Sequence, residues 1–260
     1  MNSIISNFTD KGQGTVRLDL TYQPGVALVT FDNVKRHNAL SGKMMVEFYH
    51  VITQLEQNTQ DLVAVIFMGG GLKSFCAGLD LSFAREYLTS AEDAMSLNQL
   101  MYDAIDRLTK LPLITLGIAI GGSIGGGSEL ITAFDFVCMS QQSGFIHFVQ
   151  TRMGVSSPWG GMARLVSSVG KKRALIWMAG GQKVYAKEAF EHGLVDLVVE
   201  RDEDCLNESL LFLQRFLVDD VTQRQIAPNA VRGMKLLAIK KDSNWEYVHK
   251  ILSSTVFAKL

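Results

Sequence analysis

The sequence predicts an α/β fold in which parallel strands form the core and helices make up the C-terminal part. Apolar runs of strand length alternate with segments of helical periodicity up to about residue 200. Two of these runs lead into glycine-rich loops, as strands do at ligand sites of α/β folds. From Asp202 onward the pattern is helical, with an interruption near Pro228. We therefore expect a core over residues 1–200 and a helical region over residues 201–260, and the successive strand, strand, helix units suggest a spiral.

The first strand, helix and strand unit lies between residues 25 and 68. The run Gly25–Phe31 (GVALVTF) predicts a buried strand. A helix is expected to begin near Ser41, because serine favours the N-cap position. The apolar run Leu62–Met68 (LVAVIFM) returns to a strand. Such a unit is typical of parallel sheets, whose strands need a crossover connection.

A glycine-rich loop, Gly69–Asp80 (GGGLKSFCAGLD), follows the second of these strands. A helix is expected next, from an N-cap at Thr89 or Ser90 to about Lys110. The apolar run Leu113–Ile120 (LITLGIAI) then predicts another buried strand.

The stretch Gly121–Leu130 (GGSIGGGSEL) predicts a bare backbone turn and the first turn of a helix, and five of its ten residues are glycine. It lacks the third glycine of a dinucleotide fingerprint and the lysine of a phosphate loop. Ligands of α/β folds collect beyond the carboxyl ends of strands, so this loop and Gly69–Asp80 should face one site that includes Glu129. The alternative is that the glycines only allow close packing and that Glu129 is an acid of the first helical turn.

The remaining core elements are shorter. Two strands, three helices and a final strand are expected, in this order: Asp135–Ser140, Gly144–Val149, Met162–Val169, Lys171–Ala179, Ala186–His192 and Leu194–Glu200.

The composition and charge of the chain exclude some classes of function. The chain is 47% hydrophobic and 20% charged with a formal net charge of −1, which is typical of a soluble globular protein and gives no electrostatic footprint for nucleic acid or a membrane surface. The three cysteines form no C-x-x-C pattern, so we expect no disulfide framework and no metal site. No signal peptide, transit peptide or membrane span is evident, and the expected compartment is the cytoplasm.

Five motifs together resemble the enoyl-CoA hydratase/isomerase, or crotonase, superfamily. They are HNAL at 37–40, SFCAGLDL at 74–81, GGGSEL at 125–130, MGVSSPWGG at 153–161 and AKEAFEHGLVDLVVE at 186–200. Within the superfamily the pattern is similar to ethylmalonyl-CoA decarboxylase-like members. The resemblance implies a crotonase-like spiral of ββα repeats, a helical C-terminal region that forms a homotrimer or hexamer, and an acyl-CoA thioester as substrate.

The resemblance also implies roles for individual residues. The backbone N–H groups of Ala77 and Gly126 are expected to form an oxyanion hole for the thioester carbonyl. Glu129 is expected to handle the proton, and Gln150 stands where hydratases of the family carry a second glutamate. Trp159 is expected either to wall the acyl pocket or to be a core residue.

The CoA moiety is expected to be bound through two of these motifs, and no cofactor beyond it is implied. The residues assigned to CoA binding are His37, Ala39, Cys76, Gly78, Leu79 and Asp80. Lys35, Arg36 and Lys259 are either contacts of the CoA phosphates or solvated surface charges.

Gln150 decides between reactions. A glutamine holds water but accepts no proton at neutral pH, so efficient hydration is not expected. One carboxyl and an oxyanion hole suffice to decarboxylate a short alkylmalonyl-CoA, which is the reaction we favour. The alternatives are an enoyl-CoA isomerase or hydratase, and a non-catalytic acyl-CoA or RNA-binding member. His147 is either a substitute acid or a structural hydrogen-bonding residue.

Overall fold

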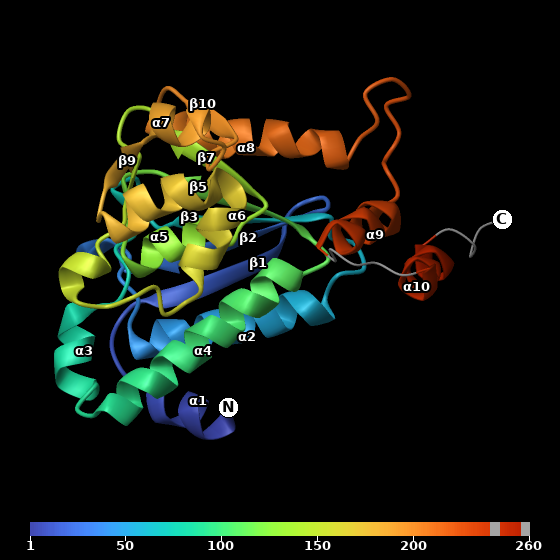
Figure 1. The fold of residues 1–260 in the computed structure, drawn as a ribbon. Coiled ribbons are helices and arrows are strands. Elements are labelled where there is room, and N and C mark those ends of the chain that lie inside the picture. Colours follow the sequence, from blue (N-terminus) through green and yellow to red (C-terminus); the bar gives the residue numbers. More distant parts are fainter. Residues whose placement is uncertain (240–244, 256–260) are drawn as a thin grey trace.

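The computed structural model of the chain describes residues 1–239 and 245–255 (Figure 1). Within these residues a six-stranded sheet has the order β1-β2-β3-β5-β7-β10. β1 and β2 are antiparallel, and the other neighbours are parallel. The strands are β1 (Thr15–Gln23), β2 (Val26–Asp32), β3 (Ala64–Gly69), β5 (Ile114–Ala119), β7 (Phe136–Ser140) and β10 (Leu197–Val199).

A second sheet has four described strands in the order β4-β6-β8-β9. Its strands are β4 (Ser74–Cys76), β6 (Gly122–Ile124), β8 (Phe145–His147) and β9 (Lys183–Tyr185). The pairs β3 and β4, β5 and β6, and β7 and β8 each give one strand to each sheet before the chain turns into helix. This is the predicted spiral of ββα repeats, and the α/β fold class is confirmed.

Helices cover both sheets and form most of the C-terminal part (Figure 1). They are α1 (Asn2–Phe8), α2 (Gly42–Gln57), α3 (Leu81–Tyr87), α4 (Ala91–Lys110), α5 (Gly126–Ile131), α6 (Gly161–Ala174), α7 (Ala186–Glu191), α8 (Cys205–Leu213), α9 (Pro228–Ile239) and α10 (Trp245–Thr255).

The central strands β3 and β5 of the six-stranded sheet are buried on both faces. Along β3, Val65 and Phe67 belong to the core that also contains residues of α2 and α4. Ala64 and Ile66 belong to the core on the other face, which contains residues of α8. Successive side chains of a strand point to opposite faces, so a continuous apolar run is what a strand covered on both sides requires.

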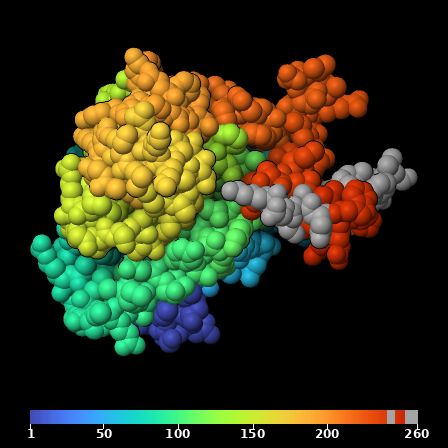
Figure 2. Space-filling model, in the orientation of Figure 1, coloured from blue at the N-terminus to red at the C-terminus, as the bar shows by residue number. Residues whose placement is uncertain are grey.

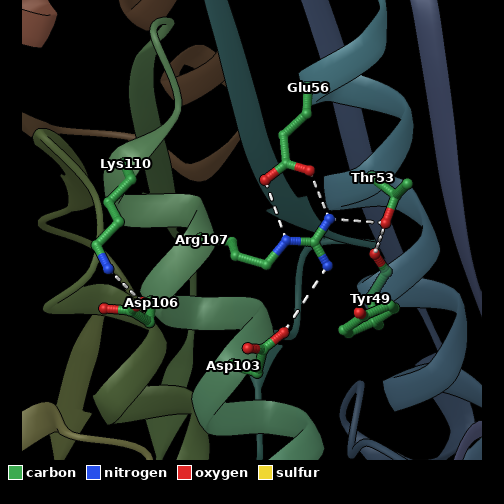
Figure 3. A network of polar contacts seen from close by, with 7 residues as sticks. All are labelled: Tyr49, Thr53, Glu56, Asp103, Asp106, Arg107 and Lys110. Carbon is green, nitrogen blue, oxygen red and sulfur yellow. Dashed lines mark hydrogen bonds and ion pairs between the residues drawn. The ribbon is translucent and has the colours of Figure 1, made fainter. Parts of the chain in front are cut away.

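Arg107 joins the two long helices α2 and α4 (Figure 3). Its Nε lies 3.0 Å from Glu56 Oε1, and one terminal nitrogen lies 2.5 Å from Glu56 Oε2 and 2.8 Å from Thr53 Oγ1. Asp103 lies 3.8 Å away, and the guanidinium stacks over the Tyr49 ring at 4.6 Å. This contact fixes the position of α4 along α2.

The predicted strands and helices of the core are largely confirmed, and two helix starts have the predicted caps. Ser41 accepts a hydrogen bond from Met44 N at the start of α2. Ser90 and Asp93 form a capping box at the start of α4. Besides β6, the helices α1 and α3 and the strands β1, β4 and β9 were not predicted, because they are short or rich in polar residues. β6 lies inside the glycine run that was interpreted as a turn alone.

Two predictions near the C-terminus are wrong. The expectation of an entirely helical region after Asp202 fails because residues 214–227 contain a short 3-10 turn and an isolated antiparallel bridge between Val218 and Gln225. Pro228 begins α9 rather than interrupting a helix, as proline favours the first turn. The loop before α9 projects from the rest of the molecule in the ribbon and the space-filling view (Figure 1, Figure 2).

Helix α9 is attached to the core by two cations. Lys235, which is buried, pairs with Asp135, and Arg232 donates to the carbonyl oxygen of Leu62 at 2.7 Å. The predicted division at residue 200 and the predicted trimerisation through this region stay predictions.

Candidate active site

The two glycine-rich loops pack against each other through their backbones. A Cβ on Gly78, whose φ is +82°, would lie 2.8 Å from Gly126 N and from Ile124 O. A Cβ on Gly127 would lie 2.0 Å from Cys76 O. Only glycine allows this approach, so these glycines bring the two loops together at one site, as predicted.

A cavity of about 480 Å³ opens beside these loops. Its wall also contains residues of α4 and of the loop before α6, and most of them are apolar, including Leu79, Leu97, Val149 and Val155. The volume lies within the range of small-molecule sites. Lys, Arg and His are absent from the lining formed by the described residues.

Glu129 lies at the bottom of this site, and its side chain is only 1% exposed. Its Oε2 accepts hydrogen bonds from Ser157 Oγ at 2.6 Å, from Trp159 N at 3.0 Å and from Gly161 N at 2.9 Å. Two donors from the loop before α6 and one from the first residue of α6 therefore hold one carboxylate oxygen in a single position. Ser157 was not assigned a role from the sequence, although it lies within the motif MGVSSPWGG.

Gln150 lies at the cavity wall next to Glu129 and is 4% exposed. Its Nε2 is 3.0 Å from Gly125 O, 3.2 Å from Ser128 Oγ and 3.4 Å from Glu129 Oε1. Its Oε1 is buried and has no hydrogen-bond partner in the described part of the chain. Gln150 thus contacts the carboxylate and keeps an acceptor unsatisfied.

Of the two N–H groups expected in an oxyanion hole, one has no acceptor in the part of the chain that the structure describes. Gly126 is the first residue of α5, and its N–H has no acceptor within the helix. Ala77 N–H instead donates to His37 O at 3.0 Å, so it is not available to a ligand. The assignment of Ala77 as an oxyanion donor is therefore corrected.

The free N–H of that loop belongs to Leu79. Leu40 pairs with the loop on both sides of it, since Leu40 N donates to Gly78 O at 2.7 Å and Asp80 N donates to Leu40 O at 2.9 Å. This parallel bridge leaves Leu79 N–H without a partner among the residues that the structure describes. Leu79 lines the cavity, as does Gly126.

Cys76, one of the residues expected to contact CoA, points into the protein. Its side chain is fully buried, and its Sγ accepts the N–H of Gly78 at 3.4 Å. Burial raises the pKa of the Cys76 thiol to about 12. Cys76 therefore contributes to the conformation of the loop.

Asp80, also expected at the CoA site, caps helix α3. Its Oδ1 accepts Ser82 N at 2.8 Å and Phe83 N at 3.3 Å, and it pairs with Arg36 at 3.0 Å. These contacts occupy one oxygen of its buried carboxylate. Arg36, considered as a phosphate contact, is held by the same ion pair.

The HNAL motif contributes its backbone conformation and the side-chain hydrogen bonds of Asn38. His37 is exposed and Ala39 is buried, and His37 and Asn38 have positive φ angles of 54° and 55°. Asn38 Nδ2 donates to Ser74 O at 2.7 Å and to Gly70 O at 3.0 Å. The motif therefore shapes the glycine-rich loop. Lys35 is exposed, and Lys259 lies outside the described residues.

Trp159 serves both of the purposes that were considered for it. Its side chain is 4% exposed and belongs to the core, yet it also lines the cavity. A Cβ on Gly126 would lie 2.1 Å from its ring, and its Nε1 donates to Asn98 Oδ1 at 3.1 Å. Arg164, which sequence analysis missed, donates to Trp159 O at 2.9 Å and to Glu129 O at 3.2 Å.

His147 does not belong to the cavity lining. Burial, with Arg152 and Lys183 nearby, lowers its pKa below the ordinary value of 6.5. A neutral imidazole outside the lining does not support its alternative role as a substitute acid.

Asn98 is a further polar residue of the lining that sequence analysis missed. It lies on α4 beside the buried residues Leu97, Leu100 and Met101. The signal in the sequence that could have found Asn98 is a polar residue at the edge of an apolar helix face.

Comparisons with known proteins identify the family of the chain. The profile of the enoyl-CoA hydratase/isomerase family matches residues 21–241. Ethylmalonyl-CoA decarboxylase of Mus musculus is 34% identical over 218 residues, which are 83% of this chain and 64% of that protein. The Homo sapiens protein of the same name is 32% identical over 81% of this chain and 66% of its own length. The chain thus spans about two thirds of the length of these relatives.

Solved structures share the fold. An enoyl-CoA hydratase from Bacillus anthracis has a TM-score of 0.78 and 24% identity, covering 92% of this chain and 88% of that one. An enoyl-CoA hydratase/carnithine racemase from Magnetospirillum magneticum has a TM-score of 0.80 and 22% identity, covering 96% and 89%. Among the described residues, none of the helices is both long and apolar enough to span a membrane. The family match over most of the sequence, together with the fold, shows that this chain belongs to the enoyl-CoA hydratase/isomerase family.

Proposed function

We propose that this protein is an acyl-CoA enzyme that stabilises the enolate of a thioester. The observation that carries the proposal is the pair of free backbone N–H groups, on Leu79 and Gly126, in the cavity that contains the carboxyl of Glu129. Each such preorganised donor typically contributes about 3 kcal/mol to stabilising developing negative charge on a carbonyl oxygen. Leu79 thereby takes the role first expected for Ala77.

The reaction we propose is decarboxylation of a short alkylmalonyl-CoA. The bond between the α-carbon and the carboxylate breaks, its electron pair forms the thioester enolate, and CO₂ leaves. Glu129 then takes up a proton from solvent and passes it to the α-carbon, which gives the saturated acyl-CoA. The similarity to ethylmalonyl-CoA decarboxylases supports this substrate class.

The surroundings of Glu129 favour this reaction over hydration. Hydration needs a second proton-transferring group, and the nearest polar side chain in the cavity, Gln150, has none to offer at neutral pH. An apolar wall also favours loss of a charged carboxylate as neutral CO₂. A double-bond shift needs only one carboxyl, so enoyl-CoA isomerisation is the second candidate.

We also propose that the CoA moiety is the only cofactor-like group, that it runs past the loop containing Leu79, and that the protein acts as a homotrimer or hexamer in the cytoplasm. The CoA path and the oligomer follow from the family resemblance, and the compartment follows from the sequence pattern.

The test is product analysis by mass spectrometry. Purified protein is incubated separately with ethylmalonyl-CoA, a 3-enoyl-CoA and crotonyl-CoA, and butyryl-CoA is expected from the first. Glu129→Gln should lower kcat by about 10² to 10⁴, as loss of an acid or base does. Glu92→Gln, an exposed change on α4, should keep full activity. Reaction of the unsaturated substrates alone would refute the decarboxylase proposal.

A further inference from the structure

The cavity contains few polar side chains. Two of them are amides, one with a free N–H donor and one with a free oxygen acceptor. Asn98 comes from α4, and Gln150 follows β8. The remaining lining is mostly apolar, with Glu129 held by its three donors. Any polar group on the acyl chain of a ligand must therefore be matched by one of these amides.

Asn98 lines the cavity and has a free hydrogen-bond donor. Its Oδ1 accepts the indole N–H of Trp159 at 3.1 Å. Because an indole nitrogen only donates, this contact fixes which end of the amide is oxygen. The Nδ2 of Asn98 has no hydrogen-bond partner among the described residues, and the side chain is half-buried.

Gln150 presents an acceptor. Its Nε2 lies against the three acceptors Gly125 O, Ser128 Oγ and Glu129 Oε1, so the opposite amide orientation would place oxygen against oxygen. The buried Oε1 that remains without a partner repels an anionic oxygen.

We propose that Asn98 is a specificity-determining residue that donates a hydrogen bond from Nδ2 to a carboxylate on the acyl group of the substrate. The proposal rests on the proposed function, in which that carboxylate is the one lost as CO₂. Gln150 and Glu129 both exclude an anion from their side of the cavity, and the described lining has no cation to receive it. Asn98 is the side-chain donor that remains.

A neutral donor suits the binding of a carboxylate that is then lost as CO₂. A lysine or arginine would form an ion pair with the carboxylate and stabilise the bound substrate more than the transition state, in which the charge has moved to the thioester oxygen. A single amide N–H orients the carboxylate and leaves most of its charge uncompensated. Asn98 therefore selects carboxylated acyl groups without holding back their decarboxylation.

The test uses two unreactive thioethers of CoA. S-(2-carboxybutyl)-CoA has a methylene group in place of the thioester carbonyl, so it forms no enolate, and S-butyl-CoA lacks only the carboxylate. Their Kd values are measured by calorimetry on wild type, Asn98→Asp, Asn98→Leu and the control Gln99→Glu. The control adds the same charge at the next, exposed position of α4.

Asn98→Asp keeps an acceptor for Trp159 and replaces the donor by an anionic oxygen. We expect it to weaken binding of the carboxylated ligand by about 100-fold, and Asn98→Leu by about tenfold, as for hydrogen bonds to charged groups. Binding of S-butyl-CoA should change less than about threefold in both variants, which shows that they are folded. Gln99→Glu should bind both ligands as wild type does.

Equal loss of both ligands, or no loss of either, would overturn the role of Asn98. So would a wild type that binds the carboxylated ligand more weakly than S-butyl-CoA. Turnover of ethylmalonyl-CoA by the wild type is measured in parallel. A selective loss of carboxylate binding without turnover would reject the proposed function alone, and turnover with unselective variants would reject the Asn98 proposal alone.

Discussion

At the scale of single residues, the site depends on how the Glu129 side chain is held. One of its oxygens receives three hydrogen bonds, two of them from backbone N–H groups. Backbone donors at Trp159 and Gly161 cannot turn away as a side chain can, so the carboxylate position is set by the chain path before α6. The chemistry of Glu129 is therefore sensitive to residues that never contact a substrate.

Gly161→Ala tests this dependence. A Cβ at this position would lie 2.6 Å from Glu129 Cγ and 2.9 Å from its Oε2, so the carboxylate must move. We expect kcat to fall by about 10- to 100-fold because a small displacement of a catalytic group is costly, while binding of S-butyl-CoA is retained. Ser167→Ala, on the exposed side of α6, is the control. Unchanged turnover would show that Glu129 tolerates displacement.

Gln150→Glu tests the interpretation of the departure from the hydratase pattern. It places a second carboxyl about where Gln150 Nε2 now lies 3.4 Å from Glu129 Oε1. Two carboxyls this close share a proton and can act as acid and base. Hydration of crotonyl-CoA, followed by loss of enoyl absorbance, should rise at least about tenfold. A hydration rate equal to that of wild type would mean that Gln150 is not what limits hydration.

At the scale of elements, the shape of the cavity depends on how firmly the helices that line it are held in place. Helix α4 contributes Leu97 and Asn98 from its N-terminal half, and Arg107 attaches its C-terminal half to α2 (Figure 3). The same helix thus carries both its cavity residues and its anchor, about two and a half turns apart.

Arg107→Lys should weaken this attachment. Lysine cannot reproduce the two-pronged contact with Glu56 or stack as a plane on Tyr49, and we expect a loss of about 1 kcal/mol in the free energy of unfolding. Urea denaturation measures it. Lys110→Met removes the exposed pair with Asp106 on the same helix and should cost only a few tenths, about 0.3 kcal/mol. Equal effects of the two variants would contradict the structural role of Arg107.

His147, which lies in β8, makes the unfolding free energy of the protein depend on pH. Burial lowers its pKa in the folded protein, so folding favours the neutral ring. The stabilisation is therefore present above the unfolded value of about 6.5 and is lost as pH falls through the lower folded value. His147→Gln should reduce the drop in unfolding free energy between neutral pH and about pH 5. An identical drop in both proteins would contradict this assignment.

At the scale of the whole molecule, two sheets share each ββα repeat, and α9 is joined to the six-stranded sheet through Asp135, the residue before β7. Lys235 reaches back to Asp135, whose carboxylate also accepts the N–H and hydroxyl of Thr115. The C-terminal region is thereby joined to the strand that precedes the second glycine-rich loop.

Lys235→Met should destabilise the protein by about 2 kcal/mol, less than breaking a fully buried ion pair because Asp135 remains partly exposed. Thermal unfolding measures the change. Lys187→Met, which removes a solvent-exposed pair on α7, serves as the control and should leave the midpoint nearly unchanged. A Lys235 variant as stable as the control would show that α9 is held by its apolar contacts alone.

The sequence by itself determined the α/β class, most core strands and helices, and the meeting of two glycine-rich loops at Glu129. These features depend on local patterns. Apolar runs such as Leu62–Met68 mark strands covered on both faces, Ser41 and Ser90 mark helix starts, and glycine marks close backbone approach.

Only the tertiary structure decided which groups in the site are free. The hydrogen bond of Ala77 to His37 and the free N–H of Leu79 both follow from the pairing of residues 37–40 with the loop Gly69–Asp80. In the bridge between Leu40 and Leu79 the two residues are 39 positions apart. The donor on Asn98 likewise exists because Trp159, from a distant loop, occupies the amide oxygen. A hydrogen bond is satisfied by whichever group lies near in space, and no local pattern records that neighbour.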